Sequence, residues 1–360
     1  MVRGEGPWGT GPYKLVEGST TPDKRSDRVV LEANMAYWNT NRFPRLKRIV
    51  FDNTLGQKEA IDLVKTKEGR VDVVSELSPL ETLQVAQSPM AKVVKSRGSL
   101  ATVFGMINML KEGSPWRDVR LRQAVNFAIN REDLIRYATK GNGVIIPALV
   151  PVNGFGYDPD LRPYPFDPDK ARQLFREAGY PNGLSITLIA SEDLVIQATV
   201  VGKMLEQAGL HVDLQLLDPA AFSRKVNHAF LEQVPEKQSW DIALMPWYDF
   251  IGNFPIYPFY HMFALNGQFD WVIEQPELQQ LYEQALRTVD REKQRELIRQ
   301  MERHTFAQAY FLFLYNPIKL YAVNKAVEFV PYVTTILNLA ETSVTEQHWS
   351  VRQQGAAVHE

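Results

Sequence analysis

The sequence contains no cysteine among its 360 residues. Disulfide bonds, thiol nucleophiles and metal or iron–sulfur sites built on cysteine are therefore excluded. An excess of charge of one sign is also lacking, because 40 Lys and Arg stand against 42 Asp and Glu, a formal net charge of -2. This balance provides no attraction to nucleic acid or to an anionic membrane surface, so we expect a small or peptide-like ligand or a protein partner.

Long apolar segments are missing as well. The longest one, Val144 to Val152, is short and contains two prolines, so the sequence predicts no membrane-spanning helix. Residues 1–12 are glycine-rich and polar and do not contain the apolar core of about 7–15 residues that a signal peptide needs. We therefore expect no signal peptide in this chain.

The sequence does have length and aromatic residues. Single hydrophobic cores stop growing at about 250–300 residues, so a chain of 360 residues is expected to form two lobes. The 18 Phe, 14 Tyr and 7 Trp supply flat apolar surface that could form the walls of a ligand pocket, although most of them must belong to the core.

Helix and strand signals divide the chain into two halves. Up to about residue 110 the pattern favours short strands at 29–33, 48–51, 92–95 and 102–109, with one helix over 55–67. Beyond residue 114 it predicts helices at 118–128, 130–137, 167–178, 194–207, 276–288 and 291–308, and strands at 185–190, 212–217, 241–247 and 310–315. Strands that alternate with capped helices indicate an α/β lobe with some parallel pairing. The last 40 or so residues are expected to be short extended pieces.

A long loop is predicted between residues 141 and 167, with prolines at 147, 151, 159, 163 and 165. A loop that is stiffened in this way usually covers a surface or lines a ligand opening. Its acidic end, Asp158 to Asp169, does not have the ligand spacing of a calcium-binding loop. Asp167 is better explained as the N-cap of the helix that begins at Pro168.

Patterns that would predict catalysis or a metal site are not found. None of the six histidines forms an i, i+4 pair or lies in an H-E-x-x-H motif. There is also no G-x-S-x-G elbow and no phosphate-binding G-x-x-x-x-G-K-[ST] loop. The sequence therefore predicts no catalytic residue, no metal site, no cofactor and no enzymatic activity.

The segment from Trp247 to Pro255 is the best candidate for a binding site. It follows an apolar strand directly, at the end where α/β lobes place their ligand-contacting loops. It combines the aromatic residues Trp247, Tyr248 and Phe254 with a single carboxylate, Asp249. A lone carboxylate costs several kcal/mol if it is buried unpaired. Asp249 therefore either faces water or meets a cation or several hydrogen-bond donors.

These segments, in this order, resemble family 5 of the substrate-binding proteins of ABC importers, the oligopeptide, dipeptide and nickel-type receptors. The family's strand entry "GTGPY" corresponds to residues 9–13, and its "N-x-x-Y-W" to Asn34–Trp38. The longest shared motif, "F-x-D-x-R-V-R-x-A-x-x-x-A-I-D-R", corresponds to Trp116–Arg131, and "D-P-x-K-A-x-x-L-x-x-x-A-G-Y" to Asp167–Tyr180. The similarity extends over nearly the whole chain.

The resemblance implies an α/β, two-lobed periplasmic-binding-protein (Venus flytrap) fold of the class II, cluster C type. Residues 1–110 would form part of lobe I with a mixed sheet, 111–318 a complete lobe II, and 319–360 a return to lobe I. Family members have a first strand and a small extra domain before "GTGPY". Only eight residues precede that motif here, so we expect a chain truncated at its N-terminus in which these parts are missing.

The resemblance also implies ligand-binding residues. In peptide binders an Asp after the strand pairs with the terminal ammonium of the peptide, and Asp249 is the matching residue. Its spacing is Trp-Tyr-Asp rather than Trp-x-x-Asp, and Pro246 replaces a glycine, which puts peptide-amino recognition in doubt. Trp247, Tyr248 and Phe254 would form the walls. Asn108 would be a pocket polar group on the crossing strand, or would serve the hinge backbone.

The expected function is the capture of a peptide or similar small solute between two lobes and its delivery to an ABC permease and ATPase. Two alternatives remain: a ligand-sensing domain of a transcription regulator, and a truncated form with impaired binding. The resemblance implies a periplasmic or extracellular, membrane-associated location. Contact with the membrane would be made only through the permease or a missing lipid anchor.

Overall fold

The computed structural model describes residues 9–21, 24–152, 154–248, 257–263, 267–273, 275–334, 336–337 and 339–356. The chain divides into two compact units. Unit 1 comprises Met1–Arg97 and Lys319–Glu360, and unit 2 comprises Gly98–Ile318. The second boundary lies between Ile318 and Lys319. The first lies at residue 97 rather than 110, because strand β8 (Ala101–Ile107) hydrogen bonds between β12 (Ile242–Tyr248) and β13 (Phe311–Pro317) of unit 2.

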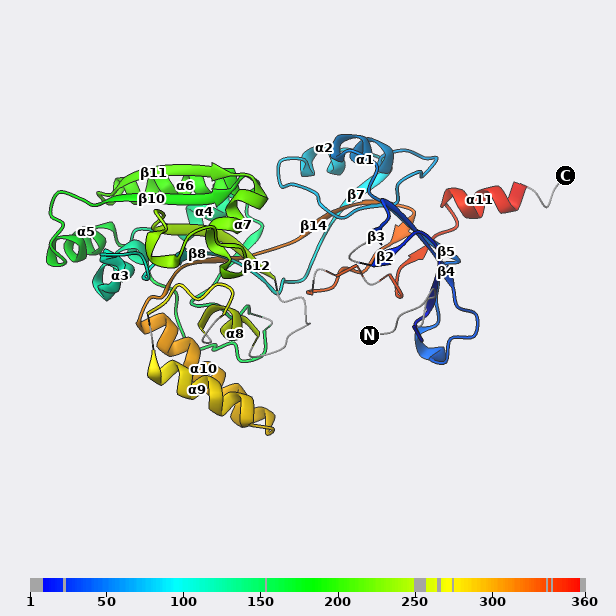
Figure 1. The fold of residues 1–360 in the computed structure, drawn as a ribbon. Helices are drawn as coiled ribbons and strands as arrows, with labels where there is room; N and C mark the ends of the chain where they lie inside the picture. The colour runs from blue at the N-terminus through cyan, green and yellow to red at the C-terminus, as the bar shows by residue number, and fades with distance from the viewer. Residues whose placement is uncertain are drawn as a thin grey trace. The chain divides into compact units, whose positions relative to one another are not determined.

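Unit 2 is built on a six-stranded mixed sheet with the order β11-β10-β12-β8-β13-β9 (Figure 1). Its remaining strands are β9 (Gly143–Ile145), β10 (Ser185–Ser191) and β11 (His211–Leu217). The strand β10 pairs in parallel with β11 and β12, whereas the pairs β12–β8, β8–β13 and β13–β9 are antiparallel. All seven residues of β8 are buried, as a continuous apolar run in the middle of a covered sheet requires.

Helices cover this sheet, and most begin and end where their sequence signals predict. They are α3 (Val119–Phe127), α4 (Arg131–Ala138), α5 (Pro168–Glu177), α6 (Val195–Gln207), α7 (Pro219–Val226), α8 (Tyr257–Phe263), α9 (Pro276–Arg287) and α10 (Arg291–Ala307). Short 3-10 turns occur at η2 (Pro115–Arg117), η3 (Glu192–Leu194), η4 (His228–Phe230) and η5 (Pro235–Lys237). The helix α6 packs on β10 and β11, and α9 lies beside α10 (Figure 1).

The helix α5 shows how a sequence signal becomes a boundary. The side chain of Asp167 accepts a hydrogen bond from the backbone N–H of Lys170, and Pro168 occupies the first turn. At the other end Gly179 has a φ of 94°, a left-handed conformation that glycine adopts without strain. The predicted cap, helix and stop are therefore all confirmed.

The longest sequence motif has a structural role. Arg131 is 4% exposed, and its guanidinium donates to the carbonyl oxygens of Phe313 (2.7 Å), Tyr164 (3.0 Å) and Asn126 (3.1 Å). Burial lowers the pKa of Arg131 to about 10. The side-chain amide of Asn126 in turn bonds the backbone of Phe311 and Phe313. These hydrogen bonds fasten α3 and α4 to β13. The motif is therefore explained by the fold and does not require a bound solute.

Unit 1 consists of small antiparallel sheets rather than one mixed sheet. Three of its strands form the order β1-β4-β5 and three more the order β6-β14-β7. Its elements are β1 (Tyr13–Glu17), β2 (Thr20–Thr21), β3 (Lys24–Arg25), β4 (Arg28–Ala33), η1 (Thr40–Arg42), β5 (Arg48–Asp52), α1 (Gln57–Val64), β6 (Val73–Val74), α2 (Thr82–Ala86), β7 (Ala91–Lys95), β14 (Leu320–Asn324), β15 (Val327–Glu328), β16 (Ser343–Val344) and α11 (Trp349–Ala356).

The C-terminal residues correct the sequence analysis, which expected only extended pieces there. The helix α11 follows β16, and His348 just before it bonds Asp72 through Nε2 at 2.9 Å. Trp349 covers Gly69 so closely that a Cβ on this glycine would lie 2.0 Å from the indole ring. Tertiary contacts with residues far away in the sequence therefore hold this helix. The short strand β9 inside the predicted loop, and the helices α2 and α8, were also not foreseen.

The chain passes between the units twice, and the two crossing segments are hydrogen-bonded to each other. The N–H of Ser96 donates to the carbonyl of Lys319 at 3.0 Å, and the N–H of Lys319 donates to Oγ of Ser96 at 3.1 Å. No helix in the described part of the chain has the length and apolar character needed to cross a bilayer.

Candidate functional site

The parallel strands of unit 2 end at one edge of the sheet. Ser191 of β10 lies opposite Leu217 of β11, and β12 continues in the same direction to Tyr248. The antiparallel strand β8 begins at this edge, because Ala101 pairs with Tyr248. We call this the carboxyl edge: the ends of β10, β11, β12 and β13 and the start of β8. Ligands of open α/β sheets bind at such an edge.

Trp247 supplies an aromatic surface at the carboxyl edge. It is half-buried, and its ring meets Phe269 edge-on at a centroid distance of 5.9 Å and an interplanar angle of 82°. The ring of His261 in α8 lies 5.3 Å away, and burial lowers the pKa of this histidine. A neutral imidazole beside two aromatic rings forms an apolar wall that carries no charge.

A buried amide lies on β13, which is separated from the strand of Trp247 by β8. Trp247 pairs with Thr102 of β8, so both side chains point to the same face of the sheet. Asn316 of β13 is 3% exposed and donates to Oγ1 of Thr102 at 2.9 Å and to the carbonyl of Ala101 at 2.8 Å. The next residue back, Tyr315, points to the other face, where its hydroxyl accepts a hydrogen bond from Gln197 of α6 at 3.3 Å. Sequence reasoning did not single out Thr102 or Asn316.

The structure does not bring Asn108 together with Trp247. Asn108 follows β8, six residues beyond the partner of Trp247, which corresponds to about 20 Å along a strand. Its side chain is 0% exposed, donates to the carbonyl of Trp240 at 3.2 Å and accepts the N–H groups of Leu110 and Lys111. These contacts support the structural role of the two that the sequence analysis had considered.

The remaining predicted residues give less information. Tyr248 is the last residue of β12, and its side chain lies outside the description. Asp249 and Phe254 lie outside the described residues altogether. Their roles stay predictions.

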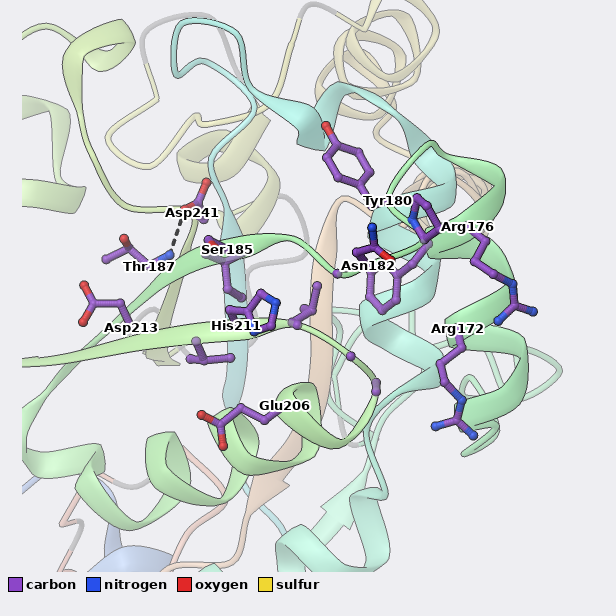
Figure 2. A pocket seen from close by; sticks show the side chains of 18 of the residues that line it. Arg172, Arg176, Tyr180, Asn182, Ser185, Thr187, Glu206, His211, Asp213 and Asp241 are labelled. Atoms are coloured by element: carbon purple, nitrogen blue, oxygen red, sulfur yellow. Dashed lines mark hydrogen bonds between the residues drawn. The ribbon is translucent and has the colours of Figure 1, made fainter.

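A separate hollow of about 1050 Å³ lies at the opposite end of the sheet, which we call the amino edge. Figure 2 shows it between the start of β10 and β11 and the end of α5, with Arg172 and Arg176 at one side and Asp213 at the other. Its lining is of mixed charge: Lys111, Arg172, Arg176, His211, Glu206, Asp213 and Asp241.

The buried carboxylate of this hollow, Asp241, stabilises the fold. Asp241 is 4% exposed and accepts hydrogen bonds from Lys111 Nζ at 3.0 Å and from Trp116 Nε1 at 3.1 Å. It also accepts one from the N–H of Thr187 at 2.8 Å, which Figure 2 shows as a dashed line. Arg172 is likewise paired with Asp169 at 2.6 Å. The amino edge thus has a buried carboxylate that joins neighbouring elements.

No metal centre is seen in the part of the chain that the structure describes, where no three His, Cys, Asp or Glu side chains are grouped so that they could hold an ion. The arrangement at the carboxyl edge is that of a recognition surface: an aromatic wall, a buried amide and the ends of parallel strands.

The sequence matches bacterial extracellular solute-binding proteins, family 5 (middle region), over residues 3–271. The chain belongs to this family. A relative is the glutathione-binding protein GsiB of Pectobacterium atrosepticum, which is 27% identical over 94% of this chain and 65% of that protein. The chain therefore spans about two thirds of the length of this relative. A second GsiB, from Escherichia coli, is 30% identical over 59% of this chain and 40% of that protein.

Solved structures show the same fold. The ABC transporter substrate-binding protein CtaP of Listeria monocytogenes superposes with a TM-score of 0.78 at 19% identity, covering 94% of this chain and 67% of that one. The periplasmic binding protein DppA of Helicobacter pylori, in complex with the peptide STSA, gives a TM-score of 0.66 at 20% identity, covering 93% and 63%. The two-lobed periplasmic-binding-protein fold expected from the sequence is thereby confirmed.

Proposed function

We propose that this chain is the solute-binding component of an ABC importer and that it binds a peptide at the carboxyl edge of unit 2. The observation that carries the proposal is the position of Trp247. It lies at the end of a parallel strand, next to the strand β8 that follows the first crossing between the units. Membership of a solute-binding family adds to this, as do a relative named for glutathione and a neighbour with a bound peptide.

The sensor alternative has less support. The relatives are named as binding proteins, and no acid–base pair is seen among the described residues at the carboxyl edge. In this proposal the chain binds its solute without transforming it and delivers it to a permease driven by an ATPase. It would act in the periplasm or outside the cell, in contact with the membrane only through the permease or a lipid anchor.

Binding of peptides can be measured by isothermal titration calorimetry with the full chain. We expect tetrapeptides or glutathione to bind, and a peptide at one hundred times its Kd to stabilise the fold by about 2.7 kcal/mol. If no peptide binds and a glycoside or a metal chelate does, the peptide assignment is wrong.

The role of Asp249 can be separated from general binding with a double-mutant cycle. A pair between its carboxylate and the peptide ammonium is worth about 1.5–3 kcal/mol, so Asp249→Asn should weaken binding at least tenfold. Acetylation of the peptide amino group should weaken binding to the unmodified protein by a similar factor and should have little further effect on Asp249→Asn. Additive losses would show that Asp249 does not meet the ammonium.

A further inference from the structure

The segment 146–152 lies at the carboxyl edge although it has no regular secondary structure. Ile146, Ala148, Leu149 and Val150 are at most 4% exposed. A buried segment outside a helix or strand needs other partners for its backbone N–H and C=O groups, because an unpaired one costs about as much as a lost hydrogen bond. Two side chains from distant parts of unit 2 meet this need.

The first is Glu302 in the helix α10. It is 2% exposed, and its two carboxylate oxygens accept the N–H groups of Leu149 at 3.3 Å and Val150 at 2.9 Å. Each oxygen therefore takes one of two successive backbone donors. A carboxylate is costly to bury unless donors surround it, and here the donors belong to the segment.

The second is Asn316. Its Oδ1 accepts the N–H of Val152 at 3.3 Å, and the hydroxyl of Thr102 donates to the carbonyl of Leu149 at 3.2 Å. Thr102 is the strand partner of Trp247. The segment is thus fixed on one side to the row of side chains that includes Trp247 and on the other side to α10.

We propose that Glu302 is a positioning residue whose ionised carboxylate clasps segment 146–152 and so fixes one wall of the solute site beside Trp247. This inference rests on the proposed function, because it takes the carboxyl edge as the place where the solute binds. Glu302 itself is too deeply buried to touch the solute and acts through the segment.

Protonation should weaken this clasp. A carboxylate accepts both N–H groups, whereas in the acid one oxygen becomes a hydroxyl that has to donate its own proton. Burial raises the pKa of Glu302 to about 7, the nearby charge of Asp158 adds to this rise, and the two N–H groups oppose it. The change in protonation therefore falls near neutral pH.

The charged groups around Glu302 come from the loop and from its own helix. Asp158 pairs with Arg303 at 2.6 Å, and Arg303 also meets Glu296 at 3.3 Å. Arg299 donates to the carbonyl of Tyr157 at 3.2 Å. Among these groups, Asp158 is the one whose charge acts on Glu302, so it offers a way to move the transition without touching the clasp.

The test combines two measurements on the full chain between pH 6 and pH 8. Amide hydrogen exchange of segment 146–152 reports on the clasp without any solute, after correction for the intrinsic pH dependence of exchange. Calorimetry with a bound peptide reports on the site. In the unmodified protein we expect both protection and affinity to fall on acidification by about fivefold, the net worth of one hydrogen bond. In Glu302→Gln both should be independent of pH and lie at the low-pH level.

Two variants keep the test decisive. Glu292→Gln makes the same change at an exposed carboxylate of the same helix and should leave both pH profiles unaltered. Asp158→Asn should move both midpoints to lower pH, which tests the inference even if Glu302→Gln fails to fold. A Glu302→Gln protein that keeps the pH dependence, or a pH-dependent exchange with an unchanged affinity, would overturn the inference. Absence of peptide binding at every pH, with the exchange behaviour as expected, would contradict the proposed function instead.

Discussion

The two edges of the sheet in unit 2 differ in how they use their polar groups. At the amino edge the buried carboxylate of Asp241 joins Lys111, Trp116 and Thr187 in a hollow of about 1050 Å³. At the carboxyl edge the buried groups Asn316 and Glu302 hold segment 146–152, which is also bonded to Thr102, the strand partner of Trp247. The buried carboxylate of the amino edge thus fastens elements of the fold, whereas in our proposal the carboxyl edge is where the solute binds.

The largest effect is expected at the amino edge. Asp241→Ala removes the partner of a lysine and of two further donors, and breaking a buried ion pair costs about 3–5 kcal/mol. We expect the free energy of unfolding in urea to fall by this amount, while peptide affinity of the folded protein stays within about twofold. A large loss of affinity at normal stability would show that the amino edge binds the solute.

The fold and the sites differ in how far the sequence predicted them. The helix α5, the strands β10 to β12 and the parallel pairing followed from local signals, namely caps, stops and apolar runs. The boundary at residue 97 did not, because the apolar run of β8 takes its hydrogen-bond partners from residues more than 130 positions away. The apolar pattern shows that a strand is buried but not which lobe buries it.

The same reason explains the site residues that were missed. Trp247 could be found because it ends an apolar strand. Glu302 lies in the charged run Arg-Gln-Met-Glu-Arg-His, which is typical of a helix face exposed to solvent. Its side chain is buried because the distant residues Leu149 and Val150 pack against it and donate their N–H groups to it. Asn108 was a candidate because its strand resembles the crossing strand of the family, but the antiparallel direction of β8 puts the start of that strand, and not its end, beside Trp247.

After the effect of Asp241→Ala, the next largest expected effect is a dependence of the free energy of unfolding on pH. The pKa of Glu302 is raised from 4.5 to about 7 in the fold, so the fold favours the neutral form relative to the unfolded chain, where water hydrates the carboxylate. The two N–H groups of the segment act in the opposite sense and favour the ionised form, but burial outweighs them. Its contribution to stability is fully present below pH 4.5 and is lost as the pH rises to about 7, a difference of about 3 kcal/mol. The unfolding free energy of the unmodified protein should therefore decrease by this amount relative to Glu302→Gln between these pH values. A constant difference would mean that Glu302 is not buried as described.

Substitutions at Trp247 and His211 compare the two edges in binding. Removal of a large aromatic contact costs about 2 kcal/mol, so Trp247→Ala should weaken peptide binding about thirtyfold in calorimetry, and Trp247→Phe should restore most of it. His211 is an exposed residue that lines the amino-edge hollow, and His211→Ala should leave the affinity unchanged. Equal losses in both variants would remove the distinction between the edges.

The smallest effects on binding are expected for two buried asparagines, Asn316 and Asn108, whose side chains hydrogen bond to backbone groups. Asn316→Ala and Asn108→Ala each leave backbone groups without a partner, which costs about 1–3 kcal/mol of stability. Only Asn316 bonds Thr102, the strand partner of Trp247, so only its substitution should also weaken peptide binding, by a few-fold. A loss of affinity in Asn108→Ala alone would restore Asn108 as a ligand-binding residue.

The most direct test of the central claim is a hydrogen-exchange footprint of a bound peptide on the full chain. If the solute binds at the carboxyl edge, the peptide should slow exchange in residues 99–102, 146–152 and 245–248. Residues 181–187 and 206–213, around the hollow of Figure 2, should exchange as they do without the peptide. Protection of the second set with no change in the first would contradict this account.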